Sequence, residues 1–156
     1  MVSEATKDDV QVLVRMRLLL QLHMEAANPR ILKHNKKWEN NLLRFYGDLI
    51  DDPNSLVLVA LDIENRQVIS MLIGQLIEDD HFEVERFVKI NDVWVDEGYR
   101  EKGICSYLFR KLIDFYKERG ITTFTLNYVI DNLEAEDTWN ALGFKPIISS
   151  CVATIN

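Results

Sequence analysis

The stretch Ile90–Lys111 reads INDVWVDEGYREKGICSYLFRK, and its two halves carry different patterns. The first half, through Val95, is rich in β-forming residues and predicts a buried strand. The second half and the residues after it predict a helix, because apolar residues recur at the spacing of one helix face, namely Ile104, Leu108, Leu112, Phe115 and Tyr116. A short turn, Asp96 to Gly103, joins the two. Free N–H groups at the start of such a helix converge and the helix dipole adds partial positive charge, so the pattern predicts an anion site, usually for phosphate.

The residues of the turn are more specific than its shape. Arg100–Cys105, Arg-Glu-Lys-Gly-Ile-Cys, resembles the Arg/Gln-x-x-Gly-x-Gly/Ala motif of GCN5-related N-acetyltransferases (the GNAT family), in which the loop wraps the pyrophosphate of acetyl-coenzyme A. Asn132–Phe144 resembles a second motif of that family, Asn-x-x-Ala-x-x-x-Tyr/Trp-x-x-x-Gly-Phe, in the right order and at the right separation. The two motifs together carry the resemblance, which extends over nearly the whole chain. Cys105 departs from the pattern, which has Gly or Ala there.

The resemblance implies a mixed α/β fold: a GNAT-like twisted, mostly antiparallel sheet with a parallel central pair splayed at a β-bulge, flanked by about four helices. It implies a single N-acetyltransferase domain over residues 1–156. The residue patterns agree with this order of elements. They predict helix 10–27, helix 36–50, a hairpin of strands 55–63 and 67–77, strand 82–95, helix 101–119, strand 121–129, a helix from 131 or 132 to 142, and a last strand or strand pair over 144–155.

The strand predicted over 82–95 contains an irregularity. Its apolar residues change parity: one set is Phe82, Val84, Val88 and Ile90, and the other is Val93 and Val95. A β-bulge has this effect, because one extra residue turns the following side chains over to the other face. The resemblance implies the same feature, since GNAT enzymes have a bulge in the fourth strand and the pantetheine arm of the coenzyme enters the gap that it opens.

Composition argues against several classes of protein. The chain has 156 residues and a formal net charge of −7, which speaks against nucleic acid as a partner because phosphate backbones require clustered Lys and Arg. No apolar run approaches the ~20 residues of a membrane span, and the N-terminus lacks the order of a signal peptide, so we expect a cytoplasmic protein without membrane contact. The 2 cysteines and 3 histidines have no metal-ligand spacing, so no metal is expected.

The resemblance also assigns residues to an acetyl-coenzyme A (acetyl-CoA) site. Backbone amides of 100–106 would bind the pyrophosphate, and amides freed by the bulge, near Val93 and Val95, would hold the thioester and pantetheine carbonyls. Helix N-termini lower thiol pKa values, but in this turn Cys105 is expected to be a small packing residue rather than a nucleophile. The residues assigned to cofactor binding are Val93, Trp94, Val95, Arg100, Glu101, Lys102, Gly103, Ile104, Cys105, Ser106, Asn132 and Trp139.

Acetyl transfer to an amine needs a general base, because alkyl amines are mostly protonated at pH 7. Asp92 is the first candidate, since it lies at the predicted bulge beside the carbonyl site. The competing interpretation of Asp92 is a solvated, loop-facing carboxylate. Glu85 is the alternate base, and Glu83 lies further back on the same predicted strand.

The general acid is less well defined. Many family members have Tyr where this chain has Trp139, and an indole N–H donates a hydrogen bond but does not release its proton near neutral pH. Trp139 therefore either packs against the pantetheine and solvates the leaving sulfur, or packs in the core while Tyr128 or water acts instead. In this family the first two helices line the acceptor pocket, so Trp38 and Tyr46 are candidates for substrate contact, against the alternative of core packing.

These patterns favour an acetyl-CoA-dependent N-acetyltransferase that moves an acetyl group by direct transfer to a primary amine of a small molecule. The acidic loop Glu78–His81 and the net charge are compatible with a cationic acceptor. One alternative is a non-catalytic acyl-CoA-binding sensor or regulatory module, supported only by Trp139, and another is a generic phosphate-binding α/β protein. The resemblance further implies a homodimer formed through the C-terminal strands.

Overall fold

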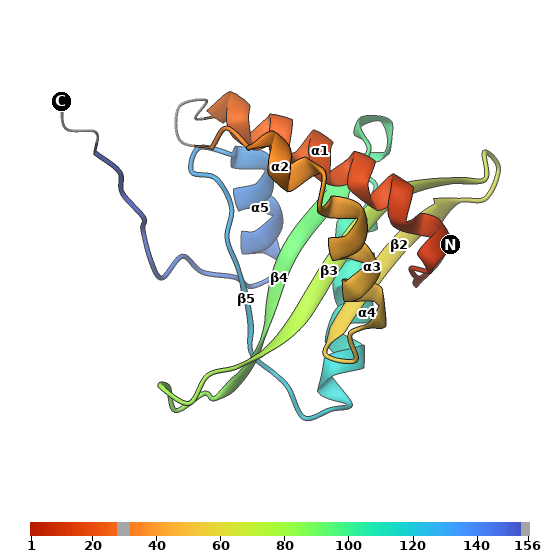
Figure 1. Cartoon of the computed structure of the whole chain (residues 1–156). Coiled ribbons are helices and arrows are strands. Elements are labelled where there is room, and N and C mark those ends of the chain that lie inside the picture. Colours follow the sequence, from red (N-terminus) through yellow and green to blue (C-terminus); the bar gives the residue numbers. More distant parts are fainter. Residues whose placement is uncertain (28–31, 154–156) are drawn as a thin grey trace.

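The structure, a computed structural model, describes residues 1–27 and 32–153. In this part of the chain the strands are β1 (Val2–Glu4), β2 (Ser55–Asp62), β3 (Gln67–Glu78), β4 (Arg86–Val95) and β5 (Phe124–Leu126). The α-helices are α1 (Val10–Ala27), α2 (Lys36–Glu39), α3 (Leu42–Asp51), α4 (Ile104–Lys117) and α5 (Leu133–Ala141). The strands form one sheet in the order β1-β2-β3-β4-β5, antiparallel except for the parallel pair β4–β5 (Figure 1). The expected mixed α/β fold class is confirmed.

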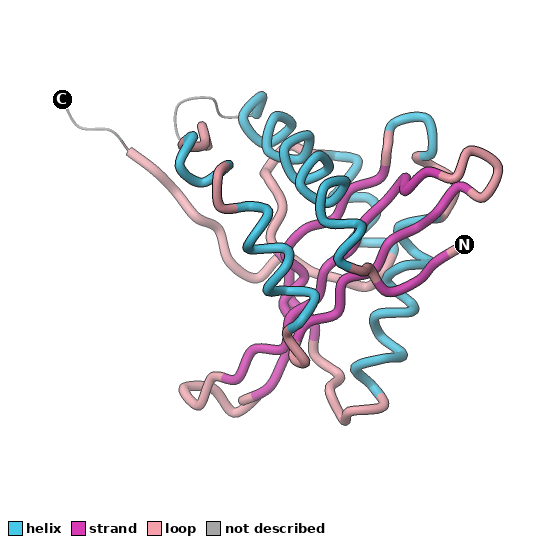
Figure 2. The backbone as a smooth tube through the Cα atoms, turned by 45° about the vertical axis from the view of Figure 1, so that its right-hand side comes forward, coloured by secondary structure: helices cyan, strands magenta, loops and turns pink. Residues whose placement is uncertain are grey.

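The sheet is buried on both faces, with helices α1 and α3 on one side and α4 on the other (Figure 2). Successive strand residues point to opposite faces, so Met71 and Ile73 of β3 pack under α1 and α3, while Leu72 packs against α4. This explains why β3 is almost continuously apolar rather than alternating. The aromatic hydroxyls in these cores are bonded: Tyr46 donates to Asp92, and Tyr116 donates to the Gly74 carbonyl.

The β-bulge predicted in the fourth strand is present. Leu72 of β3 pairs with Val93 and Gly74 pairs with Ile90, so one β3 residue opposes both Asn91 and Asp92. The parallel pairing of β4 with β5 covers only 88–90 and stops immediately before the bulge. Beyond Ile90, β4 therefore has no strand partner on its β5 side in the described chain, and the two parallel strands separate.

Strand β4 is shorter than predicted. It begins at Arg86, which pairs with Glu78 at the end of β3, and residues 82–85 form part of the hairpin loop. Phe82 is 63% exposed and Val84 is 51% exposed, although both are residue types that favour strands. The prediction was wrong here because a strand needs a partner, and beyond the Glu78–Arg86 pair the described residues make only one backbone bond across the hairpin, from the Asp79 N–H to the Glu85 carbonyl. For a related reason β5 is limited to three residues: its partner turns away at the bulge.

The structure differs from the predicted elements at two further places in the first 51 residues. The helix predicted over 36–50 is divided into α2 and α3 by Asn40 and Asn41, since asparagine side chains compete for backbone hydrogen bonds. The Asn41 side chain does so, donating to the Lys37 carbonyl at 2.8 Å. Strand β1 was not predicted; it is a three-residue edge strand that pairs with β2.

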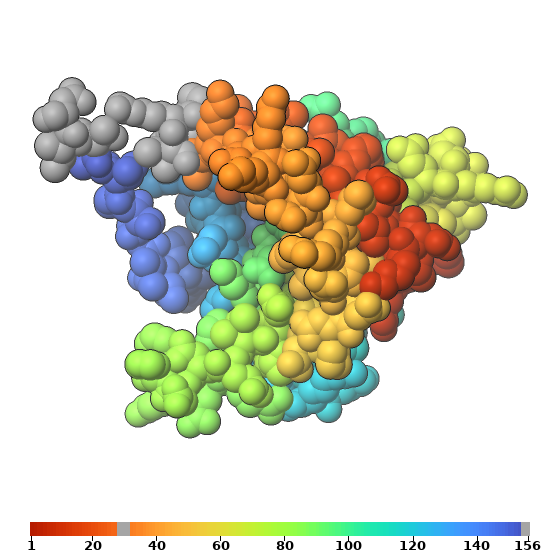
Figure 3. Space-filling model, in the orientation of Figure 1, coloured from red at the N-terminus to blue at the C-terminus, as the bar shows by residue number. Residues whose placement is uncertain are grey.

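The last predicted strand is not formed in the described part of the C-terminal segment. Residues 144–153 have no regular secondary structure, and Ile147 and Ile148 are 83% and 85% exposed. The segment projects from the body of the molecule (Figures 1 and 3). Pro146 lacks a donor, and no described strand pairs with this segment. As a result β5 lies at the edge of the described sheet, and the parallel pair is not central as expected; the end of the predicted strand, from residue 154, lies outside the described residues.

Gly74→Ala tests how closely α4 packs on the sheet. A Cβ at Gly74 would lie 2.6 Å from Leu112 Cδ1 and 3.1 Å from Val88 Cγ1, and both of these side chains are fully buried. We expect the variant to lose roughly 1–3 kcal/mol of unfolding free energy, because a packed core accepts an added methyl only by shifting. Gly98→Ala is the control, since nothing lies within 4 Å of its Cβ position. Urea denaturation measures both, and equal stabilities would contradict this packing.

Candidate active site

The turn between β4 and α4 has two halves that differ in hydrogen bonding. In the first half, the Asp96 N–H donates to the Ile69 carbonyl, and the 3₁₀ helix η2 (Glu97–Tyr99) is closed by bonds from Tyr99 and Arg100. In the second half, among the described residues, none of the amides of 101–106 has an acceptor within the protein. These are the open amides at the start of α4 on which the predicted anion site depends. The prediction also included the Arg100 amide, which is not available because it donates to the Glu97 carbonyl at 3.3 Å.

The backbone of the second half has the conformation that such a site requires. Glu101 has φ +60° and Gly103 has φ +74°, both in the left-handed region. Left-handed residues turn the N–H groups next to them toward one side of the chain, as in the anion-binding concavities of other loops. A Cβ at Gly103 would meet nothing within 4 Å, so the surface over this glycine is open.

The basic side chains of the turn, Arg100 and Lys102, form hydrogen bonds with the protein itself that hold the turn in place. Arg100 donates from Nε to the Val95 carbonyl at 3.1 Å and from Nη1 to Glu134 of α5 at 3.3 Å. Lys102 donates to the Gly98 carbonyl at 2.8 Å. Both cations therefore have partners within the protein, so the predicted anion site would consist of main-chain groups.

Cys105 lies in the first turn of α4 and is half-buried against the core behind it. Burial raises the pKa of its thiol to about 11, so the thiol stays protonated at neutral pH. This supports the packing role expected from the sequence. Its neighbours Ile104 and Ser106 are half-buried in the same turn.

Asp92 occupies the bulge and is 8% exposed. Its Oδ1 lies 3.1 Å from Arg17 Nε of α1, and its Oδ2 accepts a hydrogen bond from the Tyr46 hydroxyl of α3 at 2.8 Å. Burial raises the pKa of Asp92, and the Arg17 charge and the Tyr46 bond oppose that rise. Asp92 is thus not the solvated carboxylate of the alternative interpretation, and each oxygen keeps a second acceptor position.

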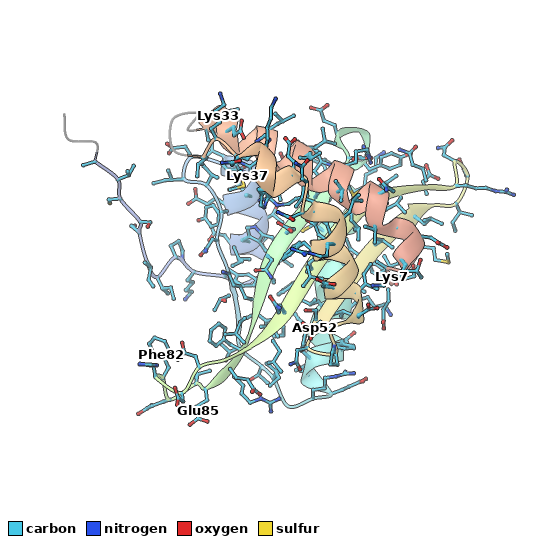
Figure 4. The ribbon with its side chains drawn as sticks, viewed as in Figure 1. Lys7, Lys33, Lys37, Asp52, Phe82 and Glu85 are labelled. Atoms are coloured by element: carbon cyan, nitrogen blue, oxygen red, sulfur yellow. The ribbon has the colours of Figure 1, made fainter. Side chains whose placement is uncertain are left out.

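Glu85 and Glu83 lie elsewhere. Both are exposed in the hairpin loop between β3 and β4 (Figure 4, where Glu85 is labelled). Six residues lie between Glu85 and Asp92, so the two are seven steps of extended chain apart, a span of about 23 Å. The structure does not bring Glu85 to the bulge, because the extended residues of β4 lie between them. The acidic loop Glu78–His81 lies at the same remote end.

That loop also brings together three candidate metal ligands, a grouping that the sequence spacing did not predict. One ligand atom each from Asp79, Asp80 and His81 lies within 4.8 Å of the others. The Asp80 and His81 side chains are 98% and 87% exposed. In the described residues no buried ligand completes the group, so we assign no metal to it.

The second motif lies beside the separated strands. Asn132 caps α5, its Oδ1 accepting from the Ala135 N–H at 3.2 Å, and its Nδ2 lies 3.0 Å from His23 Nε2 of α1. Trp139 is 6% exposed and packs edge-on against Phe109 and Phe144. This geometry favours core packing for Trp139. Tyr128, half-buried just after β5, packs against the same core.

The structure separates the two aromatic candidates for acceptor contact. Tyr46 is fully buried beneath Asp92, so its hydroxyl acts through that carboxylate. Trp38 is half-buried, with its ring 4.7 Å from Arg17 Cζ. Sequence reasoning missed Arg17. The available signal was the spacing of Arg17, Gln21 and Glu25, which recur every four residues and so place three polar side chains on one face of the helix.

None of the helices in the described residues is both long and apolar enough to cross a membrane.

Comparisons with known proteins agree with this geometry. The sequence model of the Acetyltransferase (GNAT) family matches residues 18–144. A search of curated proteins by sequence found no match. Among solved structures, a mutant of the BH1408 protein from Bacillus halodurans superposes with a TM-score of 0.88 at 19% identity, covering 100% of this chain and 99% of that chain.

Two acetyltransferase structures are also similar. Aminoglycoside antibiotic 6'-N-acetyltransferase AAC(6')-IG from Acinetobacter haemolyticus has a TM-score of 0.75 at 16% identity, covering 100% of this chain and 98% of that chain. A predicted acetyltransferase from Clostridium acetobutylicum, solved with acetyl-CoA, has a TM-score of 0.75 at 20% identity, covering 99% of this chain and 95% of that chain. These likenesses show a shared fold, and the family match extends over both motifs. The chain therefore belongs to the GNAT family of acetyltransferases.

Proposed function

We propose that this chain is an acetyl-CoA-dependent N-acetyltransferase, a single catalytic domain over residues 1–156, which acetylates a primary amine of a small-molecule acceptor by direct transfer. One observation carries the proposal: the open amides of 101–106 lie at the start of α4, beside the point where β4 and β5 separate. A diphosphate fits amides that converge, and an extended arm fits a gap between strands. The family to which the chain belongs uses acetyl-CoA.

The residues present suit the coenzyme. The amides of 101–106 offer donors at the positive end of a helix, and the absent side chain at Gly103 lets a diphosphate approach the main chain. On the β5 side of β4, residues beyond Ile90 have no strand partner in the described chain, so donors there are open to carbonyl groups. When bound, acetyl-CoA supplies the activated acetyl group.

In the proposed reaction, the chain's own residues position the acceptor and move its proton. Asp92 is the proposed base, accepting the amine proton through a water molecule, since the carboxylate is buried beneath the bulge. Burial raises its pKa toward the range in which a carboxylate accepts protons effectively, and the Tyr46 hydroxyl and Arg17 fix its orientation. Amides at the bulge polarise the reacting carbonyl, each worth about 3 kcal/mol of barrier.

The general acid is the least constrained role. Trp139 packs among aromatic side chains and carries no hydroxyl, so we propose water or Tyr128 as the proton source for the leaving thiolate. The same observation favours a second candidate function, in which the chain binds acyl-CoA as a sensor or regulatory module without turning it over.

A thiol-release screen with acetyl-CoA, against amines grouped by charge and size, tests the proposal. The transferase proposal expects thiol release that depends on which amine is present. Retention of coenzyme A with no release across the panel would support the sensor. Failure to retain coenzyme A at all would contradict both functions.

We further propose that two copies associate through the C-terminal segment. Ile147 and Ile148 are exposed on this segment, and β5 lies at the edge of the described sheet. An unpaired edge strand and an exposed apolar segment are each stabilised by pairing.

A further inference from the structure

A series of polar contacts runs along one face of α1, from the bulge in β4 toward α2. Arg17 lies beside Asp92 and donates from Nη1 to Gln21 Oε1 at 3.1 Å. Gln21 Nε2 donates to the Leu32 carbonyl at 2.6 Å and to Glu25 Oε1 at 3.3 Å. The side chain of Gln21 thus joins the bulge, through Arg17, to the segment that precedes α2.

The series ends at a histidine held between two carboxylates. His34 Nδ1 contacts Glu25 and His34 Nε2 contacts Glu39, and the His34 backbone N–H donates to Glu25 Oε1 at 2.9 Å. A neutral imidazole carries only one N–H, so both contacts are satisfied together only by the imidazolium. We call Asp92, Arg17, Gln21, Glu25, His34 and Glu39 the polar ladder.

The polar ladder is shielded from water along much of its length. Gln21 is 5% exposed, and the Arg17 and Asp92 side chains are 16% and 11% exposed. Trp38 covers it, with its ring 4.7 Å from Arg17 Cζ and 5.5 Å from the His34 ring. Opposite charges alternate along the ladder, so loss of one member leaves a shielded neighbour without its partner.

We propose that Arg17 is a positioning residue for acetyl transfer: it orients Asp92 at the bulge and, through Gln21 and Glu25, holds the segment 32–39 against α1. The inference rests on the proposed function, because the role of Asp92 as base comes from it. Arg17 of α1 contacts Oδ1 of Asp92, and Tyr46 of α3 donates a hydrogen bond to Oδ2. The two contacts together fix the orientation of the carboxylate. At the other end of the polar ladder, the contacts of Gln21 with Leu32 and of Glu25 with His34 fix the position of the segment before α2.

The groups that face His34 fix the direction of its pH dependence. They are Glu25 from α1 and Glu39 from α2; nearby Lys33, Lys36 and Lys37 are exposed and form no ion pair with either carboxylate in the described chain. The hydrogen bonds that the His34 ring donates, first to Glu25 and then to Glu39, raise the pKa of His34 above 6.5. The stabilisation that protonated His34 provides is therefore fully present below pH 6.5. It is lost as the pH rises through the raised pKa of His34. We expect the segment 32–39 to loosen on the alkaline side.

The experiment compares Arg17→Met, Arg17→Lys, Gln21→Leu and His34→Gln with the matched control His81→Gln. His81 also lies beside two carboxylates, Asp79 and Asp80, but on the exposed hairpin loop. Three quantities are measured: hydrogen exchange of the amides of 32–41 in the unliganded protein, the NMR titration of the Asp92 carboxylate, and kcat and KM against pH. The affinity for acetyl-CoA is recorded for each variant.

Arg17→Met removes the positive charge beside Asp92. We expect this to raise the pKa of Asp92, and the apparent pKa on the acid side of the kcat/KM profile, by about one pH unit. Arg17→Lys, which keeps the charge, is expected to bring both back toward wild type. Gln21→Leu and His34→Gln are expected to speed exchange in 32–41 by about tenfold and to raise the acceptor KM with little change in kcat. His81→Gln should change nothing.

Two results would overturn the inference. One is an unchanged pKa of Asp92 in Arg17→Met, and the other is an unchanged rate of hydrogen exchange in the amides of 32–41 in Gln21→Leu. If Arg17→Met does not fold, Gln21→Leu decides, since it adds no unpaired charge. Absence of amine-dependent turnover in the wild type contradicts the proposed function alone, because exchange and the Asp92 titration need no substrate.

Discussion

Gly103→Glu is expected to weaken acetyl-CoA binding by roughly a hundredfold or more, equivalent to about 3 kcal/mol. The substitution places a carboxylate over the open amides of 101–106, where nothing lies within 4 Å of the Cβ position. The added charge would occupy the anion site and repel a diphosphate from it. Isothermal titration with acetyl-CoA and with coenzyme A measures the loss.

The chain offers a matched control for this variant at the other end of the same helix. Gly120 has φ +77° and Gly103 has φ +74°, and nothing lies within 4 Å of either Cβ position. Gly120→Glu therefore adds the same charge and a similar backbone strain, about 1–2 kcal/mol in each variant. We expect Gly120→Glu to bind acetyl-CoA like wild type. Equal affinities of the two variants would place the coenzyme elsewhere.

Asp92→Asn is expected to lower kcat by roughly 10²–10⁴-fold while leaving acetyl-CoA affinity within about twofold. The amide keeps the size of the carboxylate and can still accept the Tyr46 hydrogen bond, but it cannot take a proton from the amine. Steady-state kinetics and titration calorimetry on the same preparation separate turnover from binding. Full activity in Asp92→Asn would remove Asp92 from the role of base.

Asp92→Ala is a less informative variant, for a reason visible only in the structure. Asp92→Asn removes the charge but keeps a polar atom beside Arg17 and beside Tyr46, whereas Asp92→Ala removes both oxygens. Asp92→Ala would therefore leave Arg17 largely buried with no partner at this position, at a cost of about 3–5 kcal/mol of stability. Lost activity in that variant would then mix catalysis with unfolding. Asp79→Asn, on the exposed hairpin loop remote from the bulge, is the control for removing a carboxylate, and we expect it to be fully active.

The sequence determined the features that depend on neighbours along the chain. The strand, turn and helix of 90–111 follow from apolar spacing, and the open amides follow from any helix that begins without a capping side chain. The bulge was visible as a change of apolar parity, because one inserted residue inverts every later side chain. The two motifs were enough to identify the family, which the match over 18–144 confirms.

Other features were decided by tertiary structure, because they depend on partners distant in sequence. β4 begins at Arg86 because that is where β3 can pair with it, and Phe82 was assigned to a strand on propensity alone. Trp139 lies in the core because Phe109 and Phe144 surround it. From the sequence alone, Asp92 could be a solvated carboxylate or a base. Its contacts with Arg17 and Tyr46, which show that it is not solvated, exist only in the folded protein. Burial and charge pairing arise only when helices and sheet come together, so the electrostatics of this site belong to the fold rather than to any single segment.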